Sequence, residues 1–132
     1  MRLLLDTHCW LWMLAAPTKL DEDTRALLVD PSVELLLSAA SSWEIAITHA
    51  LGKPVLPAAP ADYVPARMEA TGVRGLPVEH RHALHVAALP PHHRDPFDRV
   101  LVAQAQLEEL TLVTADQQLA PYDVDLRLIP RS

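Results

Sequence analysis

The sequence predicts a single α/β domain over residues 1–132, with a central, mostly parallel β-sheet flanked by α-helices. Short apolar runs alternate along the chain with longer segments of helical periodicity, which favours parallel strands joined by helical crossovers. Half of the 132 residues are hydrophobic, so the chain can bury a sizeable core and is not expected to be disordered. No apolar run approaches the roughly 20 residues that a membrane-spanning helix needs.

The N-terminal quarter is expected to run strand, helix, helix, strand. Residues 3–5 are a continuous apolar run, typical of a buried parallel strand, and a helix over residues 7–15 follows until a proline ends it. A second helix begins at the acidic residues 21–23, which suit the positive end of the helix dipole, and runs to about Val29. Residues 34–37 form the second predicted strand.

The next segment is predicted to be a helix followed by a connection. Ser41 and Ser42 offer N-caps for a helix over residues 43–51, and Gly52 closes it. The Pro- and Ala-rich residues 54–60 are interpreted as the connection. A further helix over residues 61–70 is expected to hold Pro65 in its first turn, and residues 76–78 are expected to be extended.

The C-terminal part begins with a helix over residues 79–89, ended by two prolines. The clearest local signal comes next: Asp95 is a good N-cap, Pro96 fits the first helical position, and Asp98 lies three residues after the cap. That helix continues to about Leu107. The remaining elements are predicted as a strand over residues 111–114, a helical turn over 116–119 and a last strand over 126–129.

Four carboxylates stand near the boundaries of these predicted elements. Asp6 and Asp116 follow two apolar strands, and Glu44 and Asp98 open two helices. Ligand sites of parallel sheets gather at the carboxyl ends of the strands, and carboxylates that converge there require a hard cation such as Mg²⁺ or Mn²⁺. Taken one at a time, each acid also suits a helix cap or a first helical turn.

Four stretches of the chain together resemble the PIN domains of VapC-type toxin ribonucleases, in the order and spacing of that family. The stretches are Leu3-Leu4-Leu5-Asp6-Thr7-His8 with Leu11-Trp12; Ser41-Ser42-Trp43-Glu44-Ile45-Ala46-Ile47 with Leu51-Gly52-Lys53; Leu89-Pro90-Pro91-His92-His93-Arg94-Asp95-Pro96-Phe97-Asp98-Arg99; and Leu110-Thr111-Leu112-Val113-Thr114-Ala115-Asp116.

This resemblance implies a PIN-like fold and a Mg²⁺- or Mn²⁺-dependent endoribonuclease that is the toxin of a toxin–antitoxin pair. It implies an acidic quartet as catalytic and metal-binding residues, namely Asp6, Glu44, Asp98 and Asp116. It also implies an antitoxin whose C-terminal segment enters the acidic groove, and a homodimer. Attack on RNA by a metal-activated water is expected to leave a 5′-phosphate and a 3′-hydroxyl.

Several neighbouring residues are secondary candidates. Asp95 lies close enough to Asp98 to be an alternative ligand, and the hydroxyls of Thr7 and Thr114 are placed to orient a carboxylate or a metal-bound water. Arg99, together with His92, His93 and Arg94, is interpreted as a small cationic rim that contacts RNA phosphates. Arg99 has the alternative of pairing with Asp95 across one helical turn.

Other chemistry-bearing residues favour structural roles. His80, His82 and His85 lack the regular Cys and His pairs of structural zinc sites. Cys9 is expected to be packed against the core, where a thiol is inert. The three tryptophans can stack on bases, although Trp10 and Trp12 share one helix and favour packing.

The net charge and the cysteine content restrict the functional class of the protein and its expected compartment. A net charge of −6 argues against a general nucleic-acid coat but not against a nuclease, whose carboxylates contribute to that total. One cysteine and no signal-peptide pattern predict the cytoplasm, without membrane attachment. The rival interpretation is a catalytically silent PIN-like module that binds RNA or protein. A phosphatase with an Asp nucleophile is disfavoured, because His8 stands where a second acid is expected.

Overall fold

A computed structural model describes residues 1–53 and 56–130. The strands are β1 (Arg2–Leu5), β2 (Glu34–Ser38), β3 (Arg74–Leu76), β4 (Thr111–Thr114) and β5 (Leu126–Leu128). The α-helices are α1 (Thr7–Ala15), α2 (Glu22–Leu28), α3 (Ala39–Ala50), α4 (Pro60–Thr71), α5 (His80–His85) and α6 (Pro96–Glu108). Short 3₁₀ turns cover η1 (Pro17–Lys19), η2 (Val86–Ala88) and η3 (Gln117–Leu119).

The five strands form one parallel sheet in the order β3-β2-β1-β4-β5, which confirms the predicted α/β class. The first strand of the chain lies at the centre, where Leu4 is in register with Leu36 on one side and Leu112 on the other. All three leucines are buried, as a central parallel strand requires. Because the strands are parallel, their carboxyl ends share one edge of the sheet.

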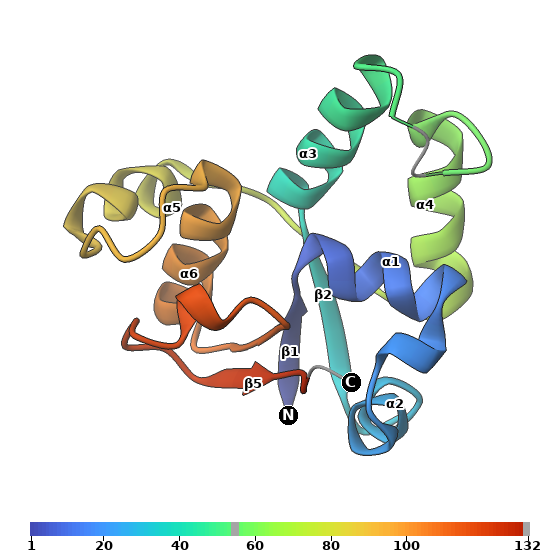
Figure 1. Ribbon diagram of the computed structural model, residues 1–132, viewed down its shortest axis with the longest axis horizontal. Coiled ribbons are helices and arrows are strands. Elements are labelled where there is room, and N and C mark those ends of the chain that lie inside the picture. The colour runs from blue at the N-terminus through green and yellow to red at the C-terminus, as the bar shows by residue number, and fades with distance from the viewer. Residues whose placement is uncertain (54–55, 131–132) are drawn as a thin grey trace.

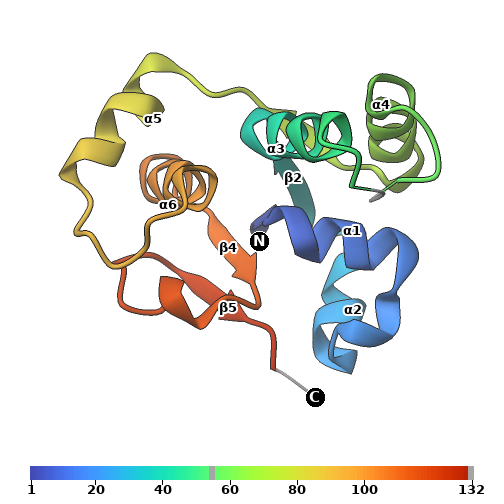
Figure 2. The same cartoon turned by 45° about the horizontal axis from the view of Figure 1, so that its top comes forward.

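Helices cover both faces of the sheet, as Figures 1 and 2 show. Alternate residues of β1 point to opposite faces. Leu3 and Leu5 pack in the core on the side of α1, α3 and α4, whereas Leu4 packs with residues of α6 on the other side. Each face therefore has its own hydrophobic core. Among the described residues, no helix has the length and apolar character needed to span a membrane.

The start of α3 corrects one prediction. Ser38, the last residue of β2, is the N-cap, and its Oγ accepts a hydrogen bond from the backbone N–H of Ala40 at 3.0 Å. Ser41, which was predicted as a cap, is buried within the helix. The helix begins directly after the strand, so Glu44 lies in its second turn rather than at its start. Gly52, with φ +80°, follows the helix as predicted.

Two further boundaries differ from prediction, and both involve proline. The third strand ends at Leu76, because Pro77 has no N–H for the ladder, so the extended segment lies two residues earlier than predicted. Pro60 occupies the first turn of α4, and Pro65 lies inside this helix instead of in its first turn. The predicted connection over residues 54–60 begins outside the described residues, which resume at Leu56.

Glu109, at the end of α6, has the one positive φ among the described non-glycine residues, +56°. A left-handed residue costs less as glycine, so we expect Glu109→Gly to raise the free energy of unfolding by about 0.5–1 kcal/mol. Urea titration measures this change. Glu108→Gly is the matched control, since Glu108 is helical and its carboxylate binds Arg81; a gain there, or a loss at Glu109, would contradict the interpretation.

Candidate metal centre

Asp6 lies at the carboxyl end of the central strand and is held by two donors. It is the N-cap of α1, where its Oδ1 accepts from the backbone N–H of Cys9 at 2.7 Å. Its Oδ2 accepts from the Thr114 hydroxyl at 2.5 Å. Asp6 and Thr114 are both buried, so this contact fixes the carboxylate between β1 and the end of β4.

Glu44 reaches the same edge of the sheet from α3. Its Oε1 accepts from the Thr7 hydroxyl at 2.7 Å, and Thr7 is the residue next to Asp6. A threonine hydroxyl thus donates a hydrogen bond to each of two acids, Glu44 and Asp6. Thr114 also accepts from the backbone N–H of Asp116 at 3.1 Å, which ties the fourth predicted acid to the first.

Asp98 and Asp116 face each other across the ring of His93. The Nε2 atom of His93 lies 3.0 Å from Asp98 Oδ2 and 2.9 Å from Asp116 Oδ2. The Nδ1 atom accepts from the backbone N–H of Arg94 at 3.0 Å, so the ring proton of neutral His93 lies on Nε2, between the carboxylates. The three side chains offer ligand atoms that all lie within 4.8 Å of one another.

The role of His93 was not recognised from sequence, which placed it in a rim facing RNA. The ring instead turns inward and separates two acids. His93 lies in an irregular segment before α6, where no helical or strand periodicity indicates the direction of a side chain. Only its position five residues before Asp98 could have marked it as a neighbour of the site.

The site raises the pKa of Asp98 to about 7. Burial is the largest cause, since it disfavours the charged form, and the carboxylates of Asp95 and Asp6 add to it. His93 opposes the shift, and Glu44 raises the pKa further. Carboxylates that make one another difficult to ionise are stabilised by a cation among them. A set of ligands made mostly of carboxylate oxygens, with one imidazole nitrogen beside them, fits a hard divalent ion.

A comparison with protein families covers the segment that carries the four acids. The family model described as "PIN domain" matches residues 3–124, which includes all four acids. The chain belongs to the PIN domain family.

Individual relatives extend the comparison. A curated protein, Ribonuclease VapC16 of Mycobacterium tuberculosis (strain ATCC 25618 / H37Rv), is 49% identical over 63 residues, which are 48% of this chain. The chain spans 45% of the length of that relative.

Solved structures share the fold at low sequence identity. VapBC2 from Rickettsia felis, bound to a DNA fragment from its promoter, has a TM-score of 0.73 at 12% identity, with 98% of this chain and 100% of that chain covered. A toxin–antitoxin complex from Klebsiella pneumoniae has a TM-score of 0.66 at 16% identity, with 98% of each chain covered. VapBC-1 from nontypeable Haemophilus influenzae has a TM-score of 0.62 at 19% identity, covering 97% of this chain and 98% of that one.

Two secondary candidates of this PIN domain have structural roles. Asp95 caps α6, and its Oδ1 accepts from the backbone N–H groups of Phe97 and Asp98. Its charge acts on the site through the pKa of Asp98. The Arg99 guanidinium does not pair with the Asp95 carboxylate, which was the alternative; it donates to backbone carbonyls and to the Tyr122 hydroxyl. The contact of Arg99 with RNA phosphates stays a prediction.

Two of the three histidines of α5, His82 and His85, are engaged in contacts within the protein. His82 is buried, its Nδ1 accepts from the Glu79 backbone N–H at 2.9 Å, and its Nε2 lies 3.2 Å from Glu108. Arg81 binds the same Glu108 carboxylate. Cys9 is buried, and burial and the nearby charge of Asp6 raise the pKa of its thiol, which excludes a nucleophilic role.

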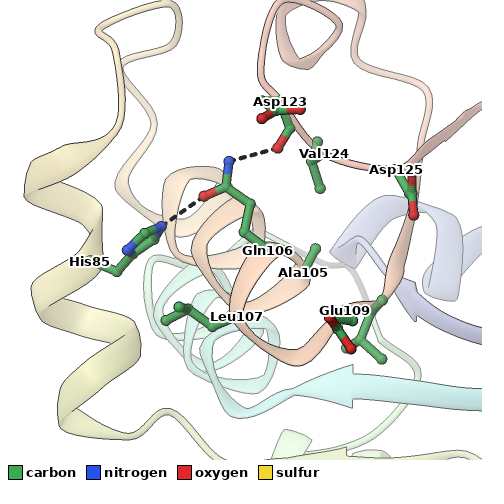
Figure 3. A pocket seen from close by; sticks show the side chains of 9 residues that line it. His85, Ala105, Gln106, Leu107, Glu109, Asp123, Val124 and Asp125 are labelled. Atoms are coloured by element: carbon green, nitrogen blue, oxygen red, sulfur yellow. Dashed lines mark hydrogen bonds between the residues drawn. The ribbon is translucent and has the colours of Figure 1, made fainter.

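A cavity lies at the opposite ends of the strands, away from the candidate metal centre. Its volume is about 680 Å³, and its lining includes Leu110 and Asp125, which immediately precede β4 and β5. Figure 3 shows two hydrogen bonds among its lining residues: His85 contacts Gln106 at 2.7 Å, and Gln106 donates to the Asp123 carbonyl at 2.8 Å. This cavity lies at the amino ends of the strands, whereas the four acids lie at the carboxyl ends. The cavity is therefore separate from the candidate metal centre.

Proposed function

We propose that this chain is a metal-dependent endoribonuclease and that Asp6, Glu44, Asp98 and Asp116 hold Mg²⁺ or Mn²⁺, directly or through water. One observation carries the proposal: acids from four separate segments are linked through Thr7, Thr114 and His93 at one edge of the sheet. Carboxylates repel one another, so hydrogen bonds that hold four of them at one place support a cation site rather than four independent helix caps.

The residues of such a site would have different roles. A bound divalent cation would lower the pKa of a coordinated water, which makes that water easier to deprotonate, and would neutralise charge on the phosphate. The hydroxyls of Thr7 and Thr114 fix the orientation of Glu44 and Asp6. His93 keeps Asp98 and Asp116 apart in the metal-free protein by placing its Nε2 proton between them. One of the four carboxylates would also accept a proton from the attacking water.

We further propose that the chain is the toxin of a toxin–antitoxin pair that acts on RNA in the cytoplasm. The relative named as a ribonuclease and the fold shared with VapBC complexes support this assignment. We propose one domain over residues 1–132, because a single sheet takes strands from Arg2 to Leu128, and a homodimer, which light scattering of the purified chain tests.

The first experiment is cleavage of a mixed, structured RNA pool by the purified chain, freed of any bound partner, with Mg²⁺, with Mn²⁺ and with a chelator. Asp98→Asn is assayed beside it. Metal-dependent cutting that the variant lacks, with 5′-phosphate and 3′-hydroxyl ends, supports the nuclease. The competing function, a silent RNA- or protein-binding module, requires that a folded chain bind RNA or antitoxin equally well with and without metal and cut nothing.

Thr114→Val tests the second layer of the site. Valine has nearly the shape of threonine but neither donates to Asp6 nor accepts from the Asp116 backbone. We expect the dissociation constant for Mn²⁺ to rise about tenfold and cleavage to fall about ten- to hundredfold. Calorimetric titration with Mn²⁺ measures the first effect. Thr71→Val, which removes a hydroxyl that only contacts its own helix α4, is the matched control and keeps both values; equal behaviour of the two variants contradicts an orienting role for Thr114.

A further inference from the structure

An apolar cavity of about 330 Å³ lies beside the candidate metal centre, between the first turns of α3 and α6. Small residues of α3 and Val78 form part of its wall, and Trp43, Phe97 and Val100 form the rest. No charged side chain lines it. Its ligand is therefore not a phosphate or an ion, and its size, at the lower end for ligand pockets, suits one small group rather than a docked helix.

Two aromatic rings flank this cavity. Trp43 and Phe97 are 5.1 Å apart between ring centroids and meet edge to face, at 76°. In that geometry each ring keeps at least one face free of the contact. The exposed fraction of Trp43 is 64%, although burying a ring of that size is strongly favourable. The cavity thus offers an open aromatic face, which is the feature on which nucleobases stack.

The position of these rings in the sequence ties the cavity to the acids. Trp43 immediately precedes Glu44 on α3, and Phe97 immediately precedes Asp98 on α6. The same two helices therefore present a carboxylate and, one residue earlier, an aromatic ring. The cavity and the carboxylates of Glu44 and Asp98 are therefore carried by the same parts of α3 and α6, so a neighbouring group of an RNA bound at the carboxylates has a site on these two helices.

We propose that this cavity binds one unpaired nucleobase of the RNA, from a nucleotide adjacent to the cleaved phosphate, with Trp43 as the stacking surface. This inference rests on the proposed ribonuclease function and adds a determinant of substrate choice. Stacking uses the face of the base, which duplex RNA does not present, so the cavity selects single-stranded or looped RNA. Because the lining has no charged group to read base edges, the cavity discriminates by strand state and ring size more than by base identity.

The test uses an RNA with a mapped cut site and four proteins: the unchanged chain, Trp43→Ala, Trp43→Phe and Leu84→Ala. Leu84, with an exposed fraction of 74%, controls for loss of an exposed apolar side chain on α5. We expect kcat/KM to fall about ten- to hundredfold for Trp43→Ala, to recover in large part for Trp43→Phe, and to stay unchanged for Leu84→Ala. Trp43 is on the surface, so circular dichroism should show all four folded alike.

Abasic nucleotides in the RNA identify the occupant. Removing the base at one position beside the cut should cost the unchanged chain as much as Trp43→Ala costs on intact RNA, and the two changes together should cost little more than either alone. Additive losses at every position, or a Trp43→Ala chain that cuts like the unchanged one, overturn the proposal. A Trp43→Ala chain that loses only antitoxin binding also overturns it, and indicates that the cavity holds a protein side chain.

A binding assay separates this inference from the proposed function. In the Asp98→Asn background, a ten-nucleotide single-stranded RNA should quench the fluorescence of Trp43 more than the same sequence in a duplex, and Trp43→Phe should remove that difference. Quenching without any cleavage by the unchanged chain leaves the nucleobase cavity supported and the nuclease refuted. Cleavage by the unchanged chain with no quenching has the opposite meaning.

Discussion

Asp98→Asn should abolish cleavage, to at least about a thousandfold below the unchanged chain, and at the same time stabilise the metal-free protein at pH 8. The first effect follows from the loss of one of four converging charges. The second follows because the pKa of Asp98 is raised to about 7, mainly by burial. At pH 8 the unchanged protein must hold an unfavourable buried charge, which asparagine lacks. We expect a gain of about 2 kcal/mol in the free energy of unfolding.

The pH dependence fixes the sign of this effect. The folded pKa of Asp98 lies above its usual value of 3.8, so the folded state binds the proton more tightly than the unfolded state. The contribution of this group is fully present below about pH 4 and is lost as pH rises to 7. The stability difference between the unchanged chain and the variant should therefore shrink steadily as pH falls from 8 to 5 and approach zero below about pH 4, as measured by urea titration in chelator.

Added metal should reverse the order of stability of the unchanged chain and Asp98→Asn. Mn²⁺ should raise the melting temperature of the unchanged chain at pH 8, more than at pH 6, and should barely affect Asp98→Asn. Glu69→Gln, an exposed acid on α4, is the matched control and should change neither stability nor metal response. A variant that loses stability at pH 8 without metal contradicts the picture of mutually repelling carboxylates.

Arg99→Met should destabilise the fold by about 2–4 kcal/mol, the largest loss that we expect from a single residue outside the two cores. Its Nη1 atom donates to the carbonyl oxygens of Pro90 and His93 and to the Tyr122 hydroxyl, at 3.0, 3.3 and 3.1 Å. Its Nη2 atom donates to the carbonyl of Val86 at 2.9 Å. One side chain thus organises the segment that carries His93 into the site.

Lysine is not expected to rescue Arg99, because one ammonium cannot match the planar fork of a guanidinium. Arg94→Met is the control on the same segment, since this arginine is exposed and only its backbone N–H bonds to His93. Urea titration compares the three variants with the unchanged chain. Equal stability of Arg94→Met and Arg99→Met would show that the carbonyl contacts contribute nothing, and the segment must then be held otherwise.

Much of the fold follows from local signals that the structure bears out. The apolar run ending at Leu5 forms the central strand, and Asp95 with Pro96 begins α6 as predicted. The start of α3 was missed because Ser38 is both the last strand residue and the helix cap, so no turn residues mark the boundary. The edge strand β3 was shifted because Arg74 and Gly75 have no strand preference of their own and pair with β2 only in the folded protein.

The site was predictable only in part for a similar reason. Sequence marks Asp6 and Asp116 as residues that follow strands, and parallel strands bring such positions together. It gives no sign that Thr114 bonds Asp6, since these residues are 108 positions apart. It also gives no direction for side chains outside regular elements, so His93 and Arg99 were both assigned to a surface rim and both turn inward.

The central place of β1 has a consequence for the time during synthesis at which the proposed metal centre can be completed. The strand β1 is made before the other four strands, yet the Thr114 hydroxyl that contacts Asp6, at the end of its neighbour β4, is made 108 residues after Asp6. At about 5–20 residues per second, that interval is about 5–20 seconds on the ribosome. A nascent chain that ends before Asp116 therefore carries three of the four acids without a complete site, and the proposed metal centre can form only after Asp116 has been made and has folded near Asp6.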